Sequence, residues 1–374
     1  MFCQVEPSSV IAVHDVSSTY HVPLLLANQG LIPVLRSTLH LSALTIPPSL
    51  LNKGAAIWTE WKRLTMSQDH LQHSTVTIAL VGKYTKLHDS YLSVVKSLEH
   101  AAMRCLKKLN LVWVDASDLE EVGRTTSSSS SATPNGQDSH HAAFHKAWHS
   151  VCTADGILVP GGFGSRGIEG MIAAARWARI HQTPFLGICL GMQIAVIEYA
   201  RNVCGIPGAS SEEFDEHCAD PLVVYMPEID KDNLGGTMRL GLRPTLWQDG
   251  SEWSRLRALY GDGGAVQERH RHRYEVNPAY IDRLHDGGLD FIGKDEKGVR
   301  MEIFELRPKP PQPAHPWYVG VQFHPEYLSR VLHPSKPYLG FVAAASRSLD
   351  AVIARTSKEG HMGALTNGTA AVVI

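Results

Sequence analysis

The 374-residue sequence has few cysteines, no long hydrophobic run and almost no net charge. Its six cysteines include no CxxC pair and no dense framework, which indicates a reduced, cytoplasmic protein rather than a secreted one. No apolar stretch reaches transmembrane length, and we expect no signal peptide. A formal net charge of −2 gives no electrostatic reason to expect nucleic acid. We therefore expect neither a membrane nor a nucleic-acid partner.

The sequence also lacks the phosphate-binding pattern GxxxxGK[S/T] and any internal repeat. What it does contain is enough apolar material for a sizeable core, because 44% of its residues are hydrophobic and only 19% are charged. A chain of this length holds two domains, or one large domain with appendages.

The chain divides into four parts by pattern. Residues 1–40 have too little apolar surface for an independent core, and residues 41–72 show a helical pattern that predicts a connecting segment. Residues 73–350 form the predicted main domain, in which the serine-rich stretch 125–141 is a low-complexity insertion. Residues 351–374 show no clear period, so we expect a loose C-terminal tail.

Strands and helices alternate through the first half of the main domain. This alternation predicts an α/β fold, with a doubly wound, mostly parallel central sheet and helices on both faces. Beyond residue 205 the pattern changes to shorter strands and turns. The expected strands of the first half lie at 76–82, 111–114 and 156–160 and in the apolar run from 184 that leads to Cys189, and the expected helices lie at 90–108 and 168–181.

The most informative motif is Gly187-Ile188-Cys189-Leu190-Gly191, which lies between an apolar strand and an apolar helical pattern. A nucleophile between two glycines at a strand-to-helix turn is a nucleophile elbow, here with cysteine in place of serine. The turn is strained, and a side chain at either glycine would collide with the neighbouring chain. The helix dipole that begins there favours thiolate over thiol.

A base and its orienting carboxylate are supplied by Phe323-His324-Pro325-Glu326. Histidine can take the thiol proton near neutral pH, and a carboxylate two residues later on an extended strand can fix the imidazole tautomer. A buried inert cysteine and a core histidine are the alternative for each residue alone. Both motifs together, each at a strand end, favour a Cys189–His324–Glu326 triad.

The glycine-rich segment 160–167 follows a strand and precedes a helix, and Gly162 to Gly167 match GxGxxG. A dinucleotide site would need this motif on the first strand of its unit and an acidic residue about 20 positions later. The segment 182–184 is Gln-Thr-Pro instead. We interpret the loop as part of an oxyanion hole, with the N–H groups of Gly162 and Leu190 as donors.

Three further patterns allow a functional and a structural interpretation. The basic run 268–275 suits a strand with alternating faces, one of which offers arginine to a substrate carboxylate. His141, His145 and His149 have helical spacing, but a solvated face is favoured over a metal site. The segment 234–241 is fit for a lid, with a plain hairpin as the alternative. We expect no metal site.

Taken together, these motifs resemble the C-terminal class I glutamine amidotransferase domain of the CTP synthase family. The resemblance covers about 75 to 350, and the front piece 14–23 looks like the end of that family's synthetase domain. It implies a flavodoxin-like class I glutaminase fold. The motifs that carry it are VGKY at 81–84 with DSY at 89–91, PGGFGSRG, GICLGMQ, NLGGTMRLG, RHRYEVN and VGVQFHPEY.

The resemblance implies a chemistry for these residues. Cys189 would attack the carboxamide of L-glutamine, with His324 as base and then acid and Glu326 orienting it. In the family, glutamine is held by residues that match Gln193, Glu213 and Arg273. Gly235, Gly236 and Arg239 fall in the segment that looks like the lid responding to GTP.

The resemblance also implies partners that this sequence does not itself accommodate. Ammonia would pass to UTP after ATP, with Mg²⁺, phosphorylates it, giving CTP, and the family forms tetramers and filaments. Since no phosphate loop occurs here, we expect no cofactor within this chain. We expect a truncated product or fragment that hydrolyses glutamine weakly and makes no CTP alone.

Two other functions remain open at the level of the sequence. One is a different cysteine hydrolase, such as a peptidase or a γ-glutamyl hydrolase, because His324 follows Cys189 at a papain-like distance. Papain-like enzymes, however, orient their histidine with asparagine and carry their cysteine near the mature N-terminus. The second is a non-catalytic assembly or regulatory element.

Overall fold

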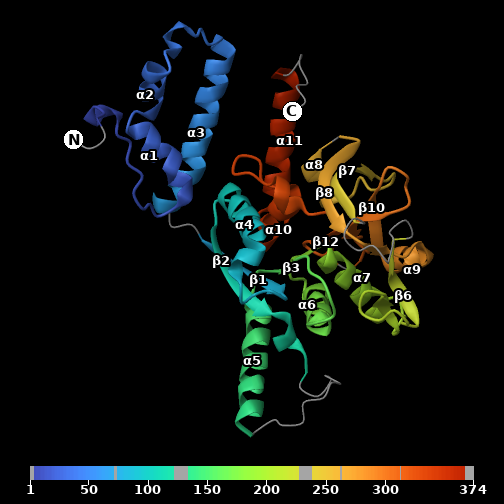
Figure 1. Cartoon of the computed structure of the whole chain (residues 1–374). Helices are drawn as coiled ribbons and strands as arrows, with labels where there is room; N and C mark the ends of the chain where they lie inside the picture. Colours follow the sequence, from blue (N-terminus) through green and yellow to red (C-terminus); the bar gives the residue numbers. More distant parts are fainter. Residues whose placement is uncertain are drawn as a thin grey trace. The chain divides into compact units, whose positions relative to one another are not determined.

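The computed structural model describes residues 4–70, 74–121, 134–226, 238–261, 263–311 and 313–366. By its internal contacts the chain separates into two compact units, residues 1–74 and residues 75–374. Figure 1 shows a helical first unit and a second unit built around a β-sheet. The two units are described separately below.

All secondary structure described in the first unit is helical. Its α-helices are α1 (Val22–Asn28), α2 (Leu31–Thr38) and α3 (Pro48–His70), with short 3-10 turns at Pro7–Ser9, Thr19–His21 and Leu41–Ala43. The Trp61 indole donates to the carbonyl of Tyr20, which ties α3 to the segment before α1. Large apolar side chains nevertheless stay exposed, as expected for a unit with little core of its own; examples are Ile32, Leu39, Leu44, Leu50 and Leu51.

The second unit contains a nine-stranded sheet in the order β2-β1-β3-β4-β12-β11-β10-β7-β8. The first five strands in this order are parallel, and the pairs from β12 to β8 are antiparallel. The strands are β1 (Thr75–Gly82), β2 (Lys108–Asp115), β3 (Gly156–Val159), β4 (Phe185–Ile188), β7 (Arg239–Trp247), β8 (Ala265–His272), β10 (Leu289–Lys294), β11 (Met301–Leu306) and β12 (Tyr318–Val321). The sheet is therefore mixed, and its parallel part contains both the first strand of this unit, β1, and the last, β12.

Helices cover both faces of this sheet, which confirms the predicted α/β class (Figure 1). One buried cluster joins the sheet to α5 (Pro134–Thr153), α6 (Ile168–Ile180) and α7 (Leu190–Asn202). The other joins it to α4 (Leu92–Arg104), α8 (Arg255–Tyr260), α10 (Lys336–Ala345) and α11 (Leu349–Thr366). The short helix α9 (Ile281–Gly287) precedes β10. The central strands β3, β4 and β12 are buried along their whole length, as parallel strands covered on both faces should be.

A second, three-stranded sheet lies in the order β5-β6-β9 and comprises Ala209–Ser211, Asp220–Tyr225 and Tyr274–Val276. The basic run therefore spans β8 and the start of β9. Along β8, buried and exposed residues alternate, so that Arg269 and Arg271 face outward while His270 and His272 face inward. The predicted alternation of this run is confirmed.

The expected loose tail is wrong for residues 351–366, which belong to α11. The helix forms because Leu349 and Val352 pack into the core and the Arg355 guanidinium donates to the carbonyl of Arg104 at the end of α4. Tertiary packing thus stabilises a segment whose own sequence has no clear period. Residues 367–374 lie outside the described residues.

Residues 134–141 of the predicted low-complexity insertion are helical and belong to α5. Pro134 is the first residue of that helix, where its missing N–H costs nothing. The three histidines with helical spacing, at 141, 145 and 149, are exposed on α5, in line with a solvated face. Residues 125–133 lie outside the described residues.

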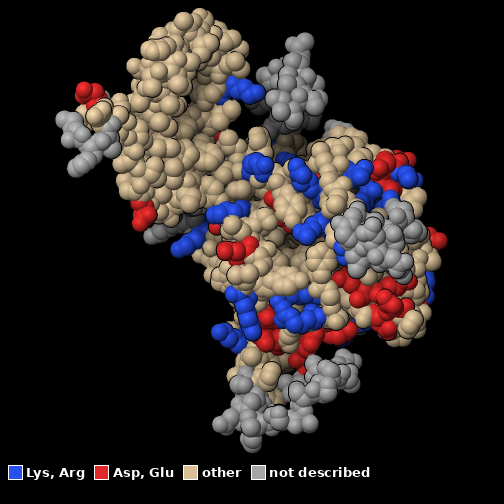
Figure 2. Space-filling view, viewed as in Figure 1, with Lys and Arg blue, Asp and Glu red and all other residues tan. Residues whose placement is uncertain are grey.

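The surface fits a nearly neutral protein. Figure 2 shows Lys and Arg side chains lying next to Asp and Glu side chains on the visible face. Among the described residues, no helix combines the length and apolar character needed to cross a bilayer.

Buried charge between two helices gives a first prediction. The Arg179 guanidinium of α6 makes two hydrogen bonds, at 2.9 and 2.6 Å, to the carboxylate of Glu198 on α7, whose side chain is fully buried. We expect Glu198→Gln to lower the free energy of unfolding by about 3 kcal/mol or more, because it leaves the guanidinium without its counter-charge. Denaturant unfolding of the folded chain measures this loss.

The matched control is Glu99→Gln, which breaks the more exposed Lys96–Glu99 pair on α4. Its expected cost is below about 1 kcal/mol. Equal losses of unfolding free energy in the two variants would contradict a larger contribution of the buried Arg179–Glu198 pair to stability.

Candidate active site

Cys189 occupies the turn between β4 and α7, with a φ of +52° that non-glycine residues seldom adopt. Both flanking glycines are required because neighbouring backbone atoms leave no room for a Cβ at either position. A Cβ on Gly187 would lie 2.5 Å from the carbonyl oxygen of Gly191, and a Cβ on Gly191 would collide with the carbonyl oxygen of Val159. Cys189 is only 6% exposed. The local geometry is that of a nucleophile elbow.

His324 comes to Cys189 through the pairing of parallel strands. β12 lies beside β4 with Val321 opposite Ile188, and the N–H of Cys189 donates to the carbonyl of Val321 at 2.7 Å. His324 follows β12 by three residues, so both side chains emerge at the same edge of the sheet. Its N–H donates to the carbonyl of Arg269 on β8 at 2.7 Å, which holds the histidine backbone from the other side.

Glu326 completes the arrangement. Its Oε1 lies 2.7 Å from Nδ1 of His324, and both side chains are almost entirely buried. Burial alone lowers the pKa of His324, but the carboxylate of Glu326 and the interaction with Cys189, which includes a hydrogen bond, outweigh it and raise that pKa well above its usual value. The structure thus brings the three predicted catalytic residues together.

The glycine loop packs directly against this group. A Cβ on Gly161 would lie 2.8 Å from Cε1 of His324, so only glycine leaves room for the ring. A Cβ on Gly162 would lie 3.3 Å from the side chain of Leu190, so the two predicted oxyanion donors come from adjoining segments. Leu190 is the first residue of α7, and its N–H has no partner within the helix. The oxyanion hole stays a prediction that this proximity supports.

Lys83, just after β1, lies beneath the same loop and was given no role from the sequence. Its buried Nζ donates to the carbonyl of Phe163 at 3.2 Å and to that of Gly164. Burial lowers its pKa to about 8, against an opposing contribution from Glu213. The signal in the sequence is the VGKY motif, but nothing local says that its lysine supports a loop 80 residues away.

Glu213 and Arg273 lie near the other end of the loop. Oε1 of Glu213 accepts from the N–H of Gly164 at 2.9 Å. Burial raises the pKa of Glu213, while the Gly164 N–H and the charges of Lys83 and Arg273 oppose that rise. These two predicted glutamine-binding residues are therefore electrostatic neighbours.

The third predicted glutamine-binding residue, Gln193, faces the protein. Its Nε2 donates to the carbonyl of Tyr274 and to Oε1 of Gln322, both at 3.1 Å. Gln322 in turn donates from Nε2 to Sγ of Cys189 at 3.5 Å. Gln322 has no assigned role in the sequence interpretation, although it lies only two residues before His324.

A cavity of about 160 Å³ opens beside the thiol. Its size suits a small polar group and its walls combine the predicted triad with the glycine loop. The remaining lining includes Tyr84, Tyr91, Arg271 and Tyr327.

The predicted lid is described only in part, because Gly235 and Gly236 lie outside the described residues. Arg239 begins β7, and its guanidinium lies 3.1 Å from Oε1 of the buried Glu302 and 3.6 Å from Glu296. Its role in a GTP response stays a prediction. In this structure Arg239 is the counter-charge of a buried carboxylate.

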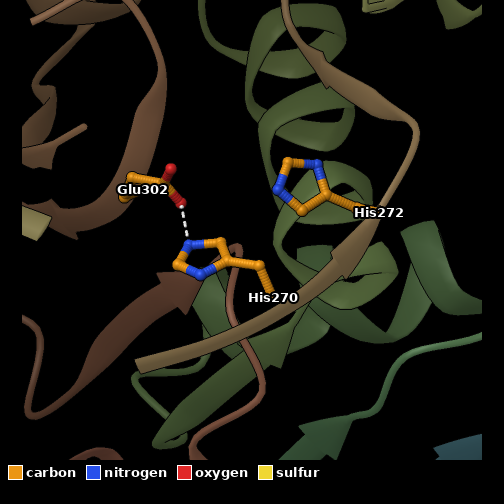
Figure 3. Close-up of side chains that lie close together, drawn as sticks. All are labelled: His270, His272 and Glu302. Carbon is orange, nitrogen blue, oxygen red and sulfur yellow. Dashed lines mark hydrogen bonds and ion pairs between the residues drawn. The ribbon is translucent and has the colours of Figure 1, made fainter. Parts of the chain in front are cut away.

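One group in the described part of the chain has the side chains of a metal site. Figure 3 shows His270 and His272 on one strand and Glu302 opposite. The candidate ligand atoms of these three side chains lie within 4.8 Å of one another. Nε2 of His270, however, is already bonded to Oε2 of Glu302 at 2.8 Å, and Arg239 neutralises the same carboxylate. Because the guanidinium of Arg239 and the hydrogen bond from His270 already occupy the carboxylate of Glu302, we interpret the cluster as a buried polar network that fixes β8 against β11.

Comparisons with known proteins agree with this geometry. A family model described as glutamine amidotransferase class-I matches residues 86–344. The CTP synthase of Schizosaccharomyces pombe is 59% identical over 353 residues, covering 94% of this chain and 55% of that protein. The CTP synthase of Neurospora crassa is 54% identical over 350 residues, covering 94% and 57%. The chain thus spans little more than half the length of these curated relatives.

Among solved structures, the glutaminase domain of Trypanosoma brucei CTPS with bound acivicin is 36% identical. The match has a TM-score of 0.59 and covers 73% of this chain and 94% of the other. A likeness of this extent confirms the class I glutaminase fold expected from the motifs.

The Glu326–His324 contact gives a second prediction. In Glu326→Gln we expect the pKa of His324 to fall below its usual value of about 6.5, because burial then acts with far less opposition. NMR titration of the imidazole signals measures the shift, and His100, whose pKa burial lowers to about 4, is the internal control. An unchanged His324 midpoint would contradict the role given to Glu326.

The raised pKa of His324 in the wild type also makes the free energy of unfolding depend on pH. Because the folded pKa lies above the unfolded value, the charged pair stabilises the wild type fully below about pH 6.5. That contribution disappears as pH rises through the folded pKa, and Glu326→Gln should lack it.

Proposed function

This chain belongs to the class I glutamine amidotransferases, among the glutaminase domains of CTP synthases, and we propose that it releases ammonia from L-glutamine through Cys189, His324 and Glu326. The observation that carries the proposal is the buried 2.7 Å contact between His324 and Glu326 beside a cysteine in an elbow conformation. That arrangement holds the base that a thiol nucleophile needs.

The reaction proceeds through a thioester. His324 takes the thiol proton, and Sγ of Cys189 attacks the carboxamide carbon of glutamine. The N–H groups of Gly162 and Leu190 stabilise the oxyanion of the tetrahedral intermediate. His324 returns the proton to the departing nitrogen, ammonia leaves, and water, deprotonated by the same imidazole, hydrolyses the glutamyl thioester to glutamate.

The amino-acid end of glutamine is held by charge. Arg273 pairs with the α-carboxylate and Glu213 with the α-ammonium, a match of sign supported by their positions near the glycine loop. Gln193 uses Nε2 for Tyr274 and Gln322, which leaves its Oε1 for contact with the substrate.

The whole enzyme uses the ammonia to convert UTP to CTP, with ATP and Mg²⁺, and responds to GTP through the segment of Gly235, Gly236 and Arg239. We place the residues for UTP and ATP in the part of the relatives' length that this chain does not span. The His270–His272–Glu302 group does not offer the oxygen ligands that Mg²⁺ prefers, so no Mg²⁺ step is assigned here. A cytoplasmic homo-oligomer completes the proposal.

The central prediction is glutamine hydrolysis without CTP formation. We expect the chain to release glutamate slowly and to form no CTP from UTP and ATP. Cys189→Ala should lower glutamate release by at least roughly 10³-fold, since it removes the nucleophile. Cys152→Ala, which changes an exposed cysteine on α5, is the matched control and should retain the wild-type rate.

Each alternative function predicts a different result in these assays. Equal glutamate release by wild type and Cys189→Ala would favour a non-catalytic assembly element. Cleavage of γ-glutamyl peptides in preference to glutamine would favour another cysteine hydrolase. CTP formed by this chain alone would overturn the division of labour proposed above.

Substrate binding gives a further prediction. Glu213→Gln should raise the KM for glutamine by about tenfold or more with little change in kcat, because a charged hydrogen bond worth roughly 1.5–3 kcal/mol is lost from ground and transition states alike. Steady-state kinetics measures both constants. Glu216→Gln, which changes a nearby exposed carboxylate, should leave KM unchanged; an equal effect would refute a specific role for Glu213.

A further inference from the structure

We propose that Gln322 is a catalytic residue: its side-chain amide donates a hydrogen bond to Sγ of Cys189 and stabilises the thiolate, while Gln193 fixes the orientation of that amide. The proposal deepens the glutaminase assignment, on which it rests, by giving the nucleophile a second stabilising partner besides His324.

The contact is direct and buried. Nε2 of Gln322 lies 3.5 Å from Sγ of Cys189, and Gln322 is 1% exposed. Water therefore does not compete for the amide, and a hydrogen bond in such a site is stronger than one in solvent.

The two ends of a glutamine amide differ chemically, so the neighbours of Gln322 decide which end faces the sulfur. The carbonyl of Tyr274 accepts hydrogen bonds only, so the end of Gln193 that lies 3.1 Å from it must be Nε2. The same Nε2 lies 3.1 Å from Gln322, which must therefore present Oε1. The NH₂ group of Gln322 is then the end that meets Sγ.

The backbone holds this chain of contacts in place. The N–H of Gln322 donates to the carbonyl of Glu302 on β11 at 2.8 Å. The N–H of Cys189 donates at 2.7 Å to the carbonyl of Val321, the residue before Gln322. Gln322, which follows β12, is thus held by β11, and Cys189, which follows β4, is held by β12. The donor is positioned before any substrate arrives, which is the condition for electrostatic stabilisation without reorganisation.

The groups around the sulfur differ in whether they stabilise the thiol or the thiolate of Cys189. The carbonyl oxygen of Arg271 lies 4.0 Å from Sγ on another side, and a carbonyl oxygen accepts from a thiol but repels a thiolate. An amide N–H does the reverse. Gln322 therefore favours the thiolate over the thiol, in the same direction as the imidazolium of His324.

This preference acts twice in the reaction. The sulfur carries most negative charge before it attacks glutamine and again when the C–S bond of the glutamyl thioester breaks, as water replaces the sulfur. Its charge is small in the thioester between these steps. Loss of the donor should therefore slow acylation by lowering the population of thiolate, and slow deacylation by destabilising the departing thiolate, with little effect on substrate affinity.

The test is the pH dependence of Cys189 alkylation. We would treat the full chain with iodoacetamide across a pH series and quantify labelling of the Cys189 peptide by mass spectrometry, which separates it from the other cysteines. The variants are Gln322→Met, which removes the amide, and Gln322→Glu, which keeps an oxygen acceptor for Gln193 but loses the donor. Gln248→Met, at the end of β7, is the matched control.

In Gln322→Met the half-maximal pH of labelling should rise by about one unit, which is a tenfold change in the acid dissociation constant of the thiol. Gln322→Glu should raise it at least as far. The kcat for glutamine at pH 7 should fall by a similar factor with KM little changed, whereas Gln248→Met should match the wild type in both assays.

A merely structural role would lower the melting temperature and leave the labelling midpoint in place. An unchanged midpoint in either folded Gln322 variant would overturn the proposal. The outcome is separable from the function itself: a shifted midpoint in a chain that releases no glutamate would support Gln322 as the thiolate partner and reject the glutaminase assignment.

Discussion

The pairing of two parallel strands, β4 and β12, is the constraint on which the rest of the site depends. Cys189 and His324 are 135 residues apart in sequence, and the register that sets Ile188 opposite Val321 brings them to one sheet edge. The hydrogen bond from the N–H of Cys189 to the carbonyl of Val321 extends that register by one step. A slip of one residue would turn each side chain to the opposite face and separate nucleophile from base.

Around this pairing the protein buries several charges that would be costly alone. Glu326 offsets the cost of a buried imidazolium at His324, and carbonyls of the glycine loop receive the ammonium of Lys83. On the antiparallel side, Arg239 and His270 share the carboxylate of Glu302, which anchors β8. β8 in turn supports the backbone of His324 through Arg269. The main effect of the buried polar contacts is thus to position the side chains of the site. Their net contribution to the free energy of folding is small by comparison.

Much of this could be predicted from the sequence, because the signals were local. Apolar runs separated by helical patterns predicted the α/β class, and the elbow and HPE motifs predicted the triad residues that the fold brings together. The network from Gln193 to Gln322 to Cys189 could not be predicted, because Gln193 and Gln322 are 129 residues apart and meet only across the folded sheet. Helix α11 was missed for a related reason, since Val352 is stabilised by core contacts and not by a periodic pattern of its own.

The most direct measurement of the central claim is the identity of the covalent intermediate. When the chain is mixed with glutamine and quenched in acid within a turnover, mass spectrometry should find one glutamyl group on the peptide that contains Cys189. The adduct should accumulate further when thioester hydrolysis is slowed. Glutamate release with no adduct on Cys189, or with the adduct on another residue, would contradict a nucleophile set in place by the β4–β12 pairing.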